Sequence, residues 1–340
     1  MIEDELRDAF ARHEAQAPAL EPLRRAIDVL AGRRRRRRAV TRAGAAAVVA
    51  ALAVALPVQV WRGKGADVLV PLIESVAPVA VPEGPLNLLL LGLDQRGTLA
   101  DSRADTIMLV HLPADGGRAY LFSINRDVVV DIPGEGRERI SATYYYSGAE
   151  GTRKAVEKLT GLRVDAVATV KFTALRSVTD ALGKVPVCLP DPVTSDHTGT
   201  VFPRGCRDYS GRDVDDLIRQ RKHLPHGGYD RDRIGQRVVL GLARKAGQLD
   251  ILRDAGAVRR LAATPGVTVD VGGLDLLGLA LRLDGTTPDM ITGIGQPTWN
   301  STPTGGERLD PKVAPELFAA LREGTMEAFV SAHPDWVLQE

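Results

Sequence analysis

The sequence has almost no net charge and few aromatic residues. Its 340 residues include 44 Lys and Arg against 43 Asp and Glu, which gives a formal net charge of +1 at pH 7. A chain balanced in this way has no overall electrostatic preference for nucleic acid, so we expect no nucleic-acid partner. Aromatic side chains make up only 4 % of the residues, and no internal repeat is visible. The length suffices for one large domain or two ordinary ones with sizeable cores.

Cysteine is also nearly absent, since only Cys188 and Cys206 occur. Nothing around them has the spacing of zinc ligands, which disfavours a structural metal site. An even count in an oxidising compartment favours one disulfide. It would close a loop of about 18 residues and stabilise the fold by about 3 kcal/mol. Two buried, unpaired thiols are the alternative.

The charge that is present is unevenly placed near the N-terminus. Residues 33–38 are an unbroken run of arginines, and an uncharged, Ala-rich stretch follows from 43 to 60. That stretch of about 18 residues is near the lower limit for a membrane-spanning helix. We expect a cytoplasmic segment at 1–38 and a transmembrane helix at 39–61, because flanking arginines stay inside. A cleaved signal peptide, including its twin-arginine variant, and a nucleic-acid-binding arginine patch are the alternatives.

After this stretch the chain reads as a linker and then a folded domain. Residues 62–85 are punctuated by Pro and Gly and predict the linker. Residues 86–93 and 107–112 are near-continuous apolar runs, typical of strands buried on both faces. Further strands are expected at 119–124, 164–172 and 185–189. Helices are expected at 152–160, 173–182 with Thr173 as cap, 214–221, 233–249, 253–263, 274–283 and 317–329.

Strands interleaved with helices in this order predict an α/β fold. We expect a central mixed sheet sandwiched by helices, with a core domain at 86–250. Residues 251–340 are expected to form a helical extension of that domain.

Arginines and aspartates stand at the ends of the predicted strands. Asp94 follows the first, Arg103 and Asp105 lead into the second, and Arg126 and Asp127 follow the third. Guanidinium groups bind phosphate oxygens in a planar, bidentate way, and carboxylates suit a hard divalent cation. The set therefore predicts a site for a polyphosphate ester with a metal. Surface salt bridges are the ordinary alternative.

Two further arginines, Arg219 and Arg221, stand far downstream. Residues i and i+2 of a regular helix point about 200° apart, so both side chains can reach one site only where a helix ends. Pro225 and the glycines after it supply such a break. His223 and His226 lie in the same segment and are expected to be loop residues at the rim of the site, not a metal pair or a general base.

An ordered set of motifs resembles the LytR-CpsA-Psr family. Residues 87–96 resemble its opening motif, 103–106 its Arg-Ser-Asp-Thr, and 122–127 its Ser-Ile-Pro-Arg-Asp. Residues 139–144 are similar to its Lys-Ile-Asn-Ala-Ala-Tyr, and 211–221 to its helix ending in Arg-x-Arg. The two cysteines match a pair found in many actinobacterial members. The resemblance covers roughly residues 86–250.

The resemblance implies a phosphotransferase that moves a glycopolymer from a polyprenyl-pyrophosphate carrier to peptidoglycan, outside the cytoplasmic membrane. It implies a Mg²⁺ ion, here on Asp94 and Asp105, and an apolar pocket for the prenyl tail. Candidate walls of that pocket are residues 238–246 and 274–283, which are also ordinary core sequences. Catalytic roles fall on Arg103, Asp105, Arg126, Arg219 and Arg221. Substrate-binding roles fall on Asp94, Arg96, Asp127, Arg139, Asp230, Arg233 and Arg237.

The sequence also departs from the family pattern. Asn125 replaces a proline, which predicts a less rigid turn before Arg126. Arg139 replaces a lysine and Ser141 an asparagine. Gln236, Arg237 and Val238 stand where Arg-Gln-Gln is expected. We interpret the chain as an active but divergent member. A polyprenyl-pyrophosphate phosphatase and a non-catalytic, lipid-pyrophosphate-binding or regulatory membrane protein are the alternatives.

The tyrosines at 144–146 stand out in a chain poor in aromatic residues. They could stack on sugar rings near the mouth of the site, or they could belong to ordinary packing.

Overall fold

The computed structural model describes residues 79–94, 102–301 and 306–338, which belong to one compact unit, Val76–Glu340. The predicted segments 1–38 and 39–61, most of the linker 62–85, and Arg96 lie outside the described residues. Within the described ranges, no helix combines the length and the apolar character needed to cross a membrane.

A mixed six-stranded sheet organises this unit, in the order β11-β6-β1-β2-β3-β12. In the middle of the sheet, β2 runs antiparallel to both of its neighbours, β1 and β3. At the sides, β6 is parallel to β1 and β12 is parallel to β3, while β11 runs antiparallel to β6. The predicted mixed α/β sheet is confirmed. The strands of this sheet are β1 Leu86–Leu93, β2 Ala104–Leu112, β3 Ala119–Ser123, β6 Ala166–Lys171, β11 Val267–Asp270 and β12 Ile291–Ile294.

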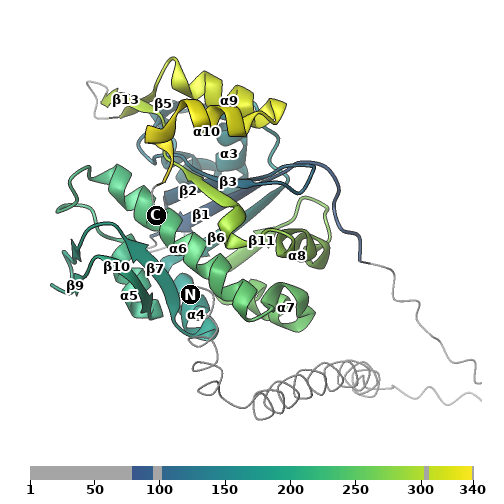
Figure 1. Ribbon diagram of the computed structural model, residues 1–340. Helices are drawn as coiled ribbons and strands as arrows, with labels where there is room; N and C mark the ends of the chain where they lie inside the picture. The colour runs from purple at the N-terminus through teal and green to yellow at the C-terminus, as the bar shows by residue number, and fades with distance from the viewer. Residues whose placement is uncertain (1–78, 95–101, 302–305, 339–340) are drawn as a thin grey trace, which may run out of the picture. The chain divides into compact units, whose positions relative to one another are not determined.

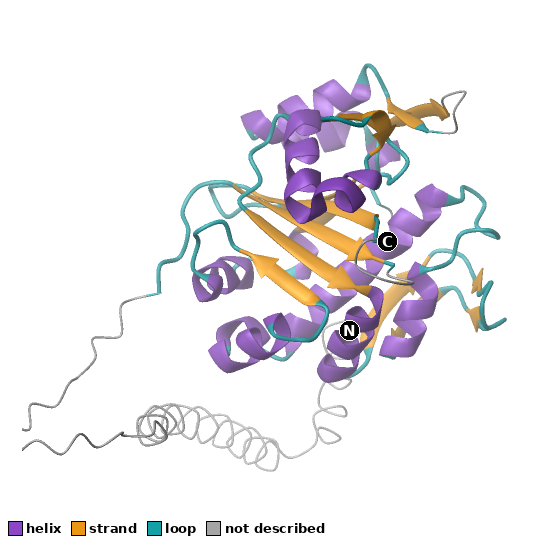
Figure 2. Cartoon of the chain, turned by 180° about the vertical axis from the view of Figure 1, so that it is seen from behind, coloured by secondary structure: helices purple, strands orange, loops and turns teal. Residues whose placement is uncertain are grey.

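Helices cover both faces of the sheet, with α3, α9 and α10 on one side and α6 on the other (Figures 1 and 2). The helices are α3 Ala142–Thr160, α4 Phe172–Leu182, α5 Gly211–Ile218, α6 Gly228–Gln248, α7 Ala255–Ala262, α8 Leu276–Asp284, α9 Val313–Glu323 and α10 Met326–Ala332, with short 3-10 turns at Ile251–Arg253, Pro288–Met290 and Pro334–Trp336.

Alternate residues of the central strands form the largest core cluster. Leu91, Leu109 and Phe122 are at most 1 % exposed and pack toward α3, α9 and α10. The Phe122 ring meets the Phe318 ring of α9 edge to face, with centroids 5.9 Å apart. The other face is also covered, since Gln236 of α6 donates to the carbonyl of Leu121. Burial on both faces explains why the central strands read as nearly continuous apolar runs.

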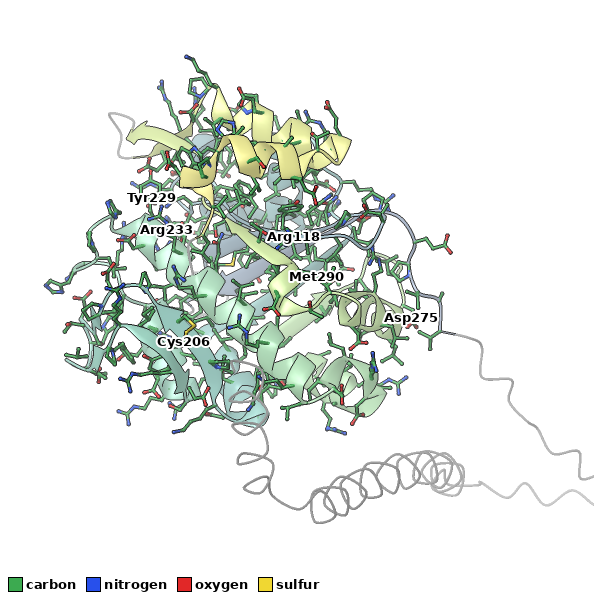
Figure 3. All side chains as sticks on the ribbon, viewed as in Figure 1. Arg118, Cys206, Tyr229, Arg233, Asp275 and Met290 are labelled. Carbon is green, nitrogen blue, oxygen red and sulfur yellow. A yellow bond between two sulfur atoms is a disulfide. The ribbon has the colours of Figure 1, made fainter. Side chains whose placement is uncertain are left out.

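A strand pair beside the sheet carries the disulfide. β7 Val185–Leu189 and β10 Gly205–Tyr209 are antiparallel, and Cys188 lies directly opposite Cys206. The two cysteines are bonded to each other (Figure 3), so the predicted disulfide is confirmed. β7 and β10 form a second core with α4, α5 and α6. Three other pairs are β4 Val129–Ile132 with β5 Gly136–Arg139, β8 Val193–Thr194 with β9 Val201–Phe202, and β13 Thr298–Ser301 with β14 Glu307–Leu309.

The segment after residue 250 is not purely helical, contrary to the prediction. It contains β11 and β12, which form the two edges of the sheet. Both strands have only four residues, too few to show a clear alternating pattern. The predicted helix 317–329 is two helices, since Gly324 ends α9 with a φ of 72°, a conformation that glycine adopts without steric cost.

Two predicted helix starts are also corrected. The helix expected at 152–160 begins at Ala142, and it contains a kink where Ser147 and Gly148 leave helical dihedral angles. Thr173 is not a cap. α4 begins one residue earlier, at Phe172, and its N-cap residue Lys171 makes no side-chain capping bond.

Candidate functional site

A β-bulge lies where β1 ends and the antiparallel strand β2 begins, and a carboxylate residue stands on each strand there. Gly92 pairs with Thr106 and Leu93 pairs with Ala104, so Asp105 is an extra residue in β2. A bulge bends its strand and redirects a side chain. Asp105 follows Ala104, whose partner Leu93 is the residue before Asp94. Gly92 is needed here, because a Cβ at that position would lie 2.9 Å from the Thr106 Cβ.

Asp105 binds Arg126, which follows β3. The Arg126 Nη1 donates to Asp105 Oδ1, and its Nε lies 3.9 Å from Asp127 Oδ2. Burial disfavours the charged guanidinium, but the attraction of Asp105 and Asp127 outweighs it and raises the pKa of Arg126. A fully charged arginine between two carboxylates therefore stands at the centre of the predicted site.

Two more predicted site residues have guanidinium groups close to the Asp127 carboxylate. The Arg139 Nη1 lies 3.3 Å from Asp127 Oδ1, and the Arg221 Nη2 lies 3.7 Å from Asp127 Oδ2. Burial first, and then repulsion from Arg126, lowers the pKa of Arg221. Three guanidinium groups thus converge on one carboxylate, an arrangement of planar donors that suits a polyanionic ligand.

Arg219 closes the site from the other side. α5 ends at Ile218 and Arg219 is its C-cap residue. The helix predicted through residue 221 therefore ends three residues earlier, and the prediction that the two arginines lie at a helix end is confirmed. The Arg219 Nη1 donates to Asp94 Oδ1 at 3.0 Å and its Nε to Asp215 Oδ1 at 2.8 Å. Its guanidinium carbon lies 5.3 Å from the centre of the Phe172 ring. These contacts fix the planar guanidinium group of Arg219 in one orientation.

The turn before Arg126 is not loosened by the replacement of proline. Asn125 is 3 % exposed, and its Oδ1 accepts from the backbone N–H of Asp127 at 2.9 Å. Its Nδ2 donates to Asp232 Oδ2 at 3.1 Å. The predicted loss of rigidity is therefore wrong, because an Asx turn and a buried side-chain bond hold the backbone instead.

The remaining predicted residues lie just before β2 and on α6. Arg103 is exposed just before β2 and forms no ion pair with a described residue. Asp230 accepts from the backbone N–H of His226 at 2.8 Å, and Arg233 lies 3.5 Å from Asp230. Arg237 is buried within α6. His223 is an exposed loop residue paired with Asp196, as expected of the rim.

Gln236, one of the divergent positions, has a supporting role in the sheet. Its Nε2 donates to Ser123 Oγ and to the carbonyl of Ile294, each at 2.7 Å. These bonds tie α6 to β3 and β12.

The three tyrosines at 144–146 differ in burial. Tyr144 packs against the main core, whereas Tyr145 and Tyr146 are 48 % and 41 % exposed.

Residues of the candidate lipid-pocket walls also have packing partners. Val238 belongs to the core beside β7, and Leu279 packs with residues of the sheet face near α8. These contacts are those of ordinary core side chains.

Sequence reasoning missed Asp232, a buried acid next to Arg126. Arg231 lies 3.2 Å from its Oδ1. Burial raises the pKa of Asp232 to about 6, although Arg231, Arg126 and Asn125 all favour its charged form. The signal was present as a second aspartate in the sequence 230–233, Asp-Arg-Asp-Arg. Only the orientation of α6 shows that this one faces inward.

A cavity of about 440 Å³ opens beside Asp232. It lies between the first turns of α6, which carry Tyr229 and Arg233 (Figure 3), and the segment that follows β12. Its lining includes Tyr229, Asp232, Arg233, Gln236, Gln296 and Trp336.

Comparisons with known proteins agree with this architecture. The sequence model of the LytR_cpsA_psr family matches residues 72–307. Cell wall biosynthesis protein LcpA of Corynebacterium glutamicum is 26 % identical over 294 residues, which cover 72 % of this chain and 57 % of LcpA. Regulatory protein MsrR of Staphylococcus aureus is 30 % identical, covering 48 % of this chain and 50 % of MsrR. The chain thus spans about half the length of these curated relatives.

Solved structures show the same fold. A structure of TagT bound to LIIa-WTA superposes with a TM-score of 0.59 at 22 % identity, covering 74 % of this chain and 94 % of TagT. TagU of Bacillus subtilis gives a TM-score of 0.57 at 20 % identity, covering 71 % of this chain and 96 % of TagU. At these identities the likeness establishes the fold alone.

Proposed function

Because this chain belongs to the LytR-CpsA-Psr family, we propose that it transfers a cell-wall glycopolymer from a polyprenyl-pyrophosphate carrier to peptidoglycan. The name of the relative LcpA, a cell wall biosynthesis protein, supports this proposal, as does the ligand LIIa-WTA in the structure of TagT. The transfer would take place outside the cytoplasmic membrane, with residues 39–61 as the anchor.

The observation that carries the proposal is the convergence of Arg126, Arg139 and Arg221 on Asp127, with Arg219 on Asp94 nearby. In the absence of substrate these guanidinium groups balance the carboxylates. A pyrophosphate placed among them would accept several charge-assisted hydrogen bonds from donors already oriented. Pre-oriented charge is the main catalytic requirement of phosphoryl transfer, which needs little other chemistry from the protein.

The proposal includes a Mg²⁺ ion on Asp94 and Asp105, because carboxylate oxygens are ligands that Mg²⁺ prefers. No group of three or more His, Cys, Asp or Glu side chains suited to a metal occurs among the described residues. Mg²⁺ commonly uses only one or two carboxylates, with water and substrate phosphate completing its shell. Asp94 and Asp105 would hold it, and when bound it would neutralise charge on the phosphate oxygens.

In the proposed reaction an acceptor hydroxyl attacks the phosphorus that bears the glycopolymer. The bond from that phosphorus to the bridging oxygen breaks, and polyprenyl phosphate leaves with the electron pair. Arg126, Arg219 and Arg221 would stabilise the charge that develops on the phosphate oxygens. A phosphatase would use the same site with water as the attacking group, and the identity of the product separates the two activities.

The proposal is tested with the full-length chain in detergent and a synthetic polyprenyl-pyrophosphate disaccharide. We expect Mg²⁺-dependent release of polyprenyl phosphate. Arg126→Ala should lower the rate about 10²- to 10³-fold, because an oriented donor to the transition state is lost. Arg163→Ala is the matched control, since its side chain is 83 % exposed and pairs only with Asp165 among the described residues. An Arg126→Ala rate equal to that of the control would contradict the proposal.

A further inference from the structure

The cavity beside Asp232 contains polar side chains whose hydrogen-bonding capacity is unused. Gln296 is 4 % exposed, yet neither polar atom of its amide has a partner among the described residues. The Oε1 of Gln236 also has no hydrogen-bond partner among the described residues. Both residues line the cavity. Buried amides left unpaired are costly, so water or a polar ligand in the cavity must complete them.

The chemistry of these groups selects the kind of ligand. An amide offers two donors and an acceptor, the combination that neighbouring sugar hydroxyls satisfy. Two aromatic residues, Tyr229 and Trp336, also line the cavity. The Tyr229 hydroxyl donates to Glu307 and accepts from Thr298 Oγ1 at 2.6 Å, so its ring is held in place. An apolar prenyl chain would leave the amides unpaired.

The cavity adjoins the predicted pyrophosphate site through one residue pair. The Nδ2 of Asn125 donates to Asp232 Oδ2 at 3.1 Å, and the residue that follows Asn125 in the chain is Arg126. Charge interactions couple Asp232 to Arg126. A sugar in the cavity would therefore present a hydroxyl close to a phosphate bound by Arg126.

We propose that this cavity is the subsite for the acceptor sugar, and that Asp232 accepts the proton of its attacking hydroxyl. The inference rests on the proposed transfer reaction and names its base and its acceptor site. The hydroxyl oxygen forms a bond to the phosphorus that bears the glycopolymer, while its proton passes to a carboxylate oxygen of Asp232. The bond from phosphorus to the bridging oxygen breaks, and polyprenyl phosphate carries away the electron pair.

The surroundings of Asp232 suit this role near neutral pH. It faces Arg231 on α6, Arg126 on the turn after β3, and Tyr229 one turn earlier on α6. Burial raises the pKa of Tyr229 to about 12, so the tyrosine stays neutral. His226 and Arg233 also line the cavity. A carboxylate with a pKa of about 6 is ionised at pH 7.5 and still basic enough to take a proton.

The first test replaces the carboxylate by an amide of the same shape. With a polyprenyl-pyrophosphate disaccharide as donor and a soluble peptidoglycan tetrasaccharide as acceptor, Asp232→Asn should lower kcat about 10²-fold or more. The KM for the donor should stay within about twofold of wild type. The acidic limb of the wild-type pH profile, near pH 6, should disappear. A variant that keeps both the rate and the limb overturns the assignment of the base.

The second test separates the subsite from the chemistry. Gln296→Leu keeps the size of the side chain and removes its hydrogen bonds, so the KM for the tetrasaccharide should rise about tenfold with kcat little changed. Binding of the tetrasaccharide without donor, followed by NMR, should weaken to the same degree. Unchanged binding overturns the subsite. A wild-type chain that binds the sugar but releases no polyprenyl phosphate refutes the proposed function and the base, and supports the subsite.

Each variant is compared with Asp131→Asn, a carboxylate-to-amide change at a side chain that is 65 % exposed. Thermal unfolding of all three variants shows whether they are folded. Because Gln296→Leu keeps the carboxylate, it tests the subsite even where Asp232→Asn is unstable.

Discussion

At the scale of single residues, the site is a set of charges that neutralise one another until a ligand enters. Asp127 is approached by Arg126, Arg139 and Arg221, and Asp94 by Arg219. Such pairs are weak evidence for stability, because desolvation offsets their attraction. Their clustering, which joins the ends of β1, β3 and β5 to the segment that follows α5, indicates a binding role instead.

Asp232 gives a prediction about stability and pH. Its pKa is raised from 3.8 to about 6 in the folded state, so the folded state holds this proton more tightly than the unfolded state. The resulting stabilisation is complete below about pH 4 and is lost as the pH rises through about 6, a change of up to about 3 kcal/mol. The unfolding free energy of Asp232→Asn minus that of wild type should therefore increase as the pH is raised from 4 to 7.5.

Urea unfolding at several pH values measures this difference. Asp131→Asn serves as the control for replacing a carboxylate by an amide. Unfolding free energies of wild type and Asp232→Asn that run parallel from pH 4 to pH 7.5 would show that Asp232 does not titrate as described.

At the scale of elements, α6 connects the site to both cores. Gln236 binds it to β3 and β12, and Gly241 brings its backbone against β7. A Cβ at Gly241 would lie 2.2 Å from the carbonyl oxygen of Pro186, whereas Gly247, on the same helix, has nothing within 4 Å. The close approach of α6 and β7 is thus made possible by one glycine.

Replacing these two glycines should have opposite effects. Gly241→Ala should lower the unfolding free energy by about 1–3 kcal/mol or more, because the backbone of β7 must move. Gly247→Ala should raise it by about 0.5–1 kcal/mol through higher helix propensity. Denaturant unfolding of the two variants compares them directly. Equal effects would mean that α6 and β7 do not pack as described.

The disulfide supports the same region. Cys188→Ser with Cys206→Ser should cost about 2–4 kcal/mol on the chain-entropy account, and transfer activity measured well below the midpoint of unfolding should remain, because neither sulfur contacts the arginine cluster. Thermal unfolding with and without a reductant is the measurement. A wild-type midpoint that is insensitive to full reduction would argue against a stabilising role for this bond.

Elements with a strong local pattern could be predicted from the sequence, and elements that depend on distant partners could not. β1 begins and ends at the predicted residues because its apolar run is long and continuous. β11 and β12 have four residues each, and their pairing with β6 and β3 is a tertiary effect. A helix end near Arg219 and Arg221 was predictable from their spacing, although α5 ends at Ile218 and not at residue 221. The inward position of Asp232 was not, because it depends on how α6 crosses β3.

At the scale of the whole molecule, the chain order of the strands explains why the site forms where it does. β1, β2 and β3 are adjacent in the sheet, and the residues that follow β1, precede β2 and follow β3 meet at one edge. The helix pair α5 and α6 then adds Arg219, Arg221 and Asp232 from later in the sequence. The arginine cluster and the cavity that contains Gln236 and Gln296 are the places proposed here for the donor and the acceptor.

The most direct test of the central claim is the chemical identity of the product. The full-length chain is incubated with a polyprenyl-pyrophosphate disaccharide, the peptidoglycan tetrasaccharide and Mg²⁺, and the products are identified by mass spectrometry. The account predicts a phosphodiester that joins the two saccharides, in equal amount to the polyprenyl phosphate released. Release of polyprenyl phosphate with only a free disaccharide phosphate would contradict transfer and identify a phosphatase.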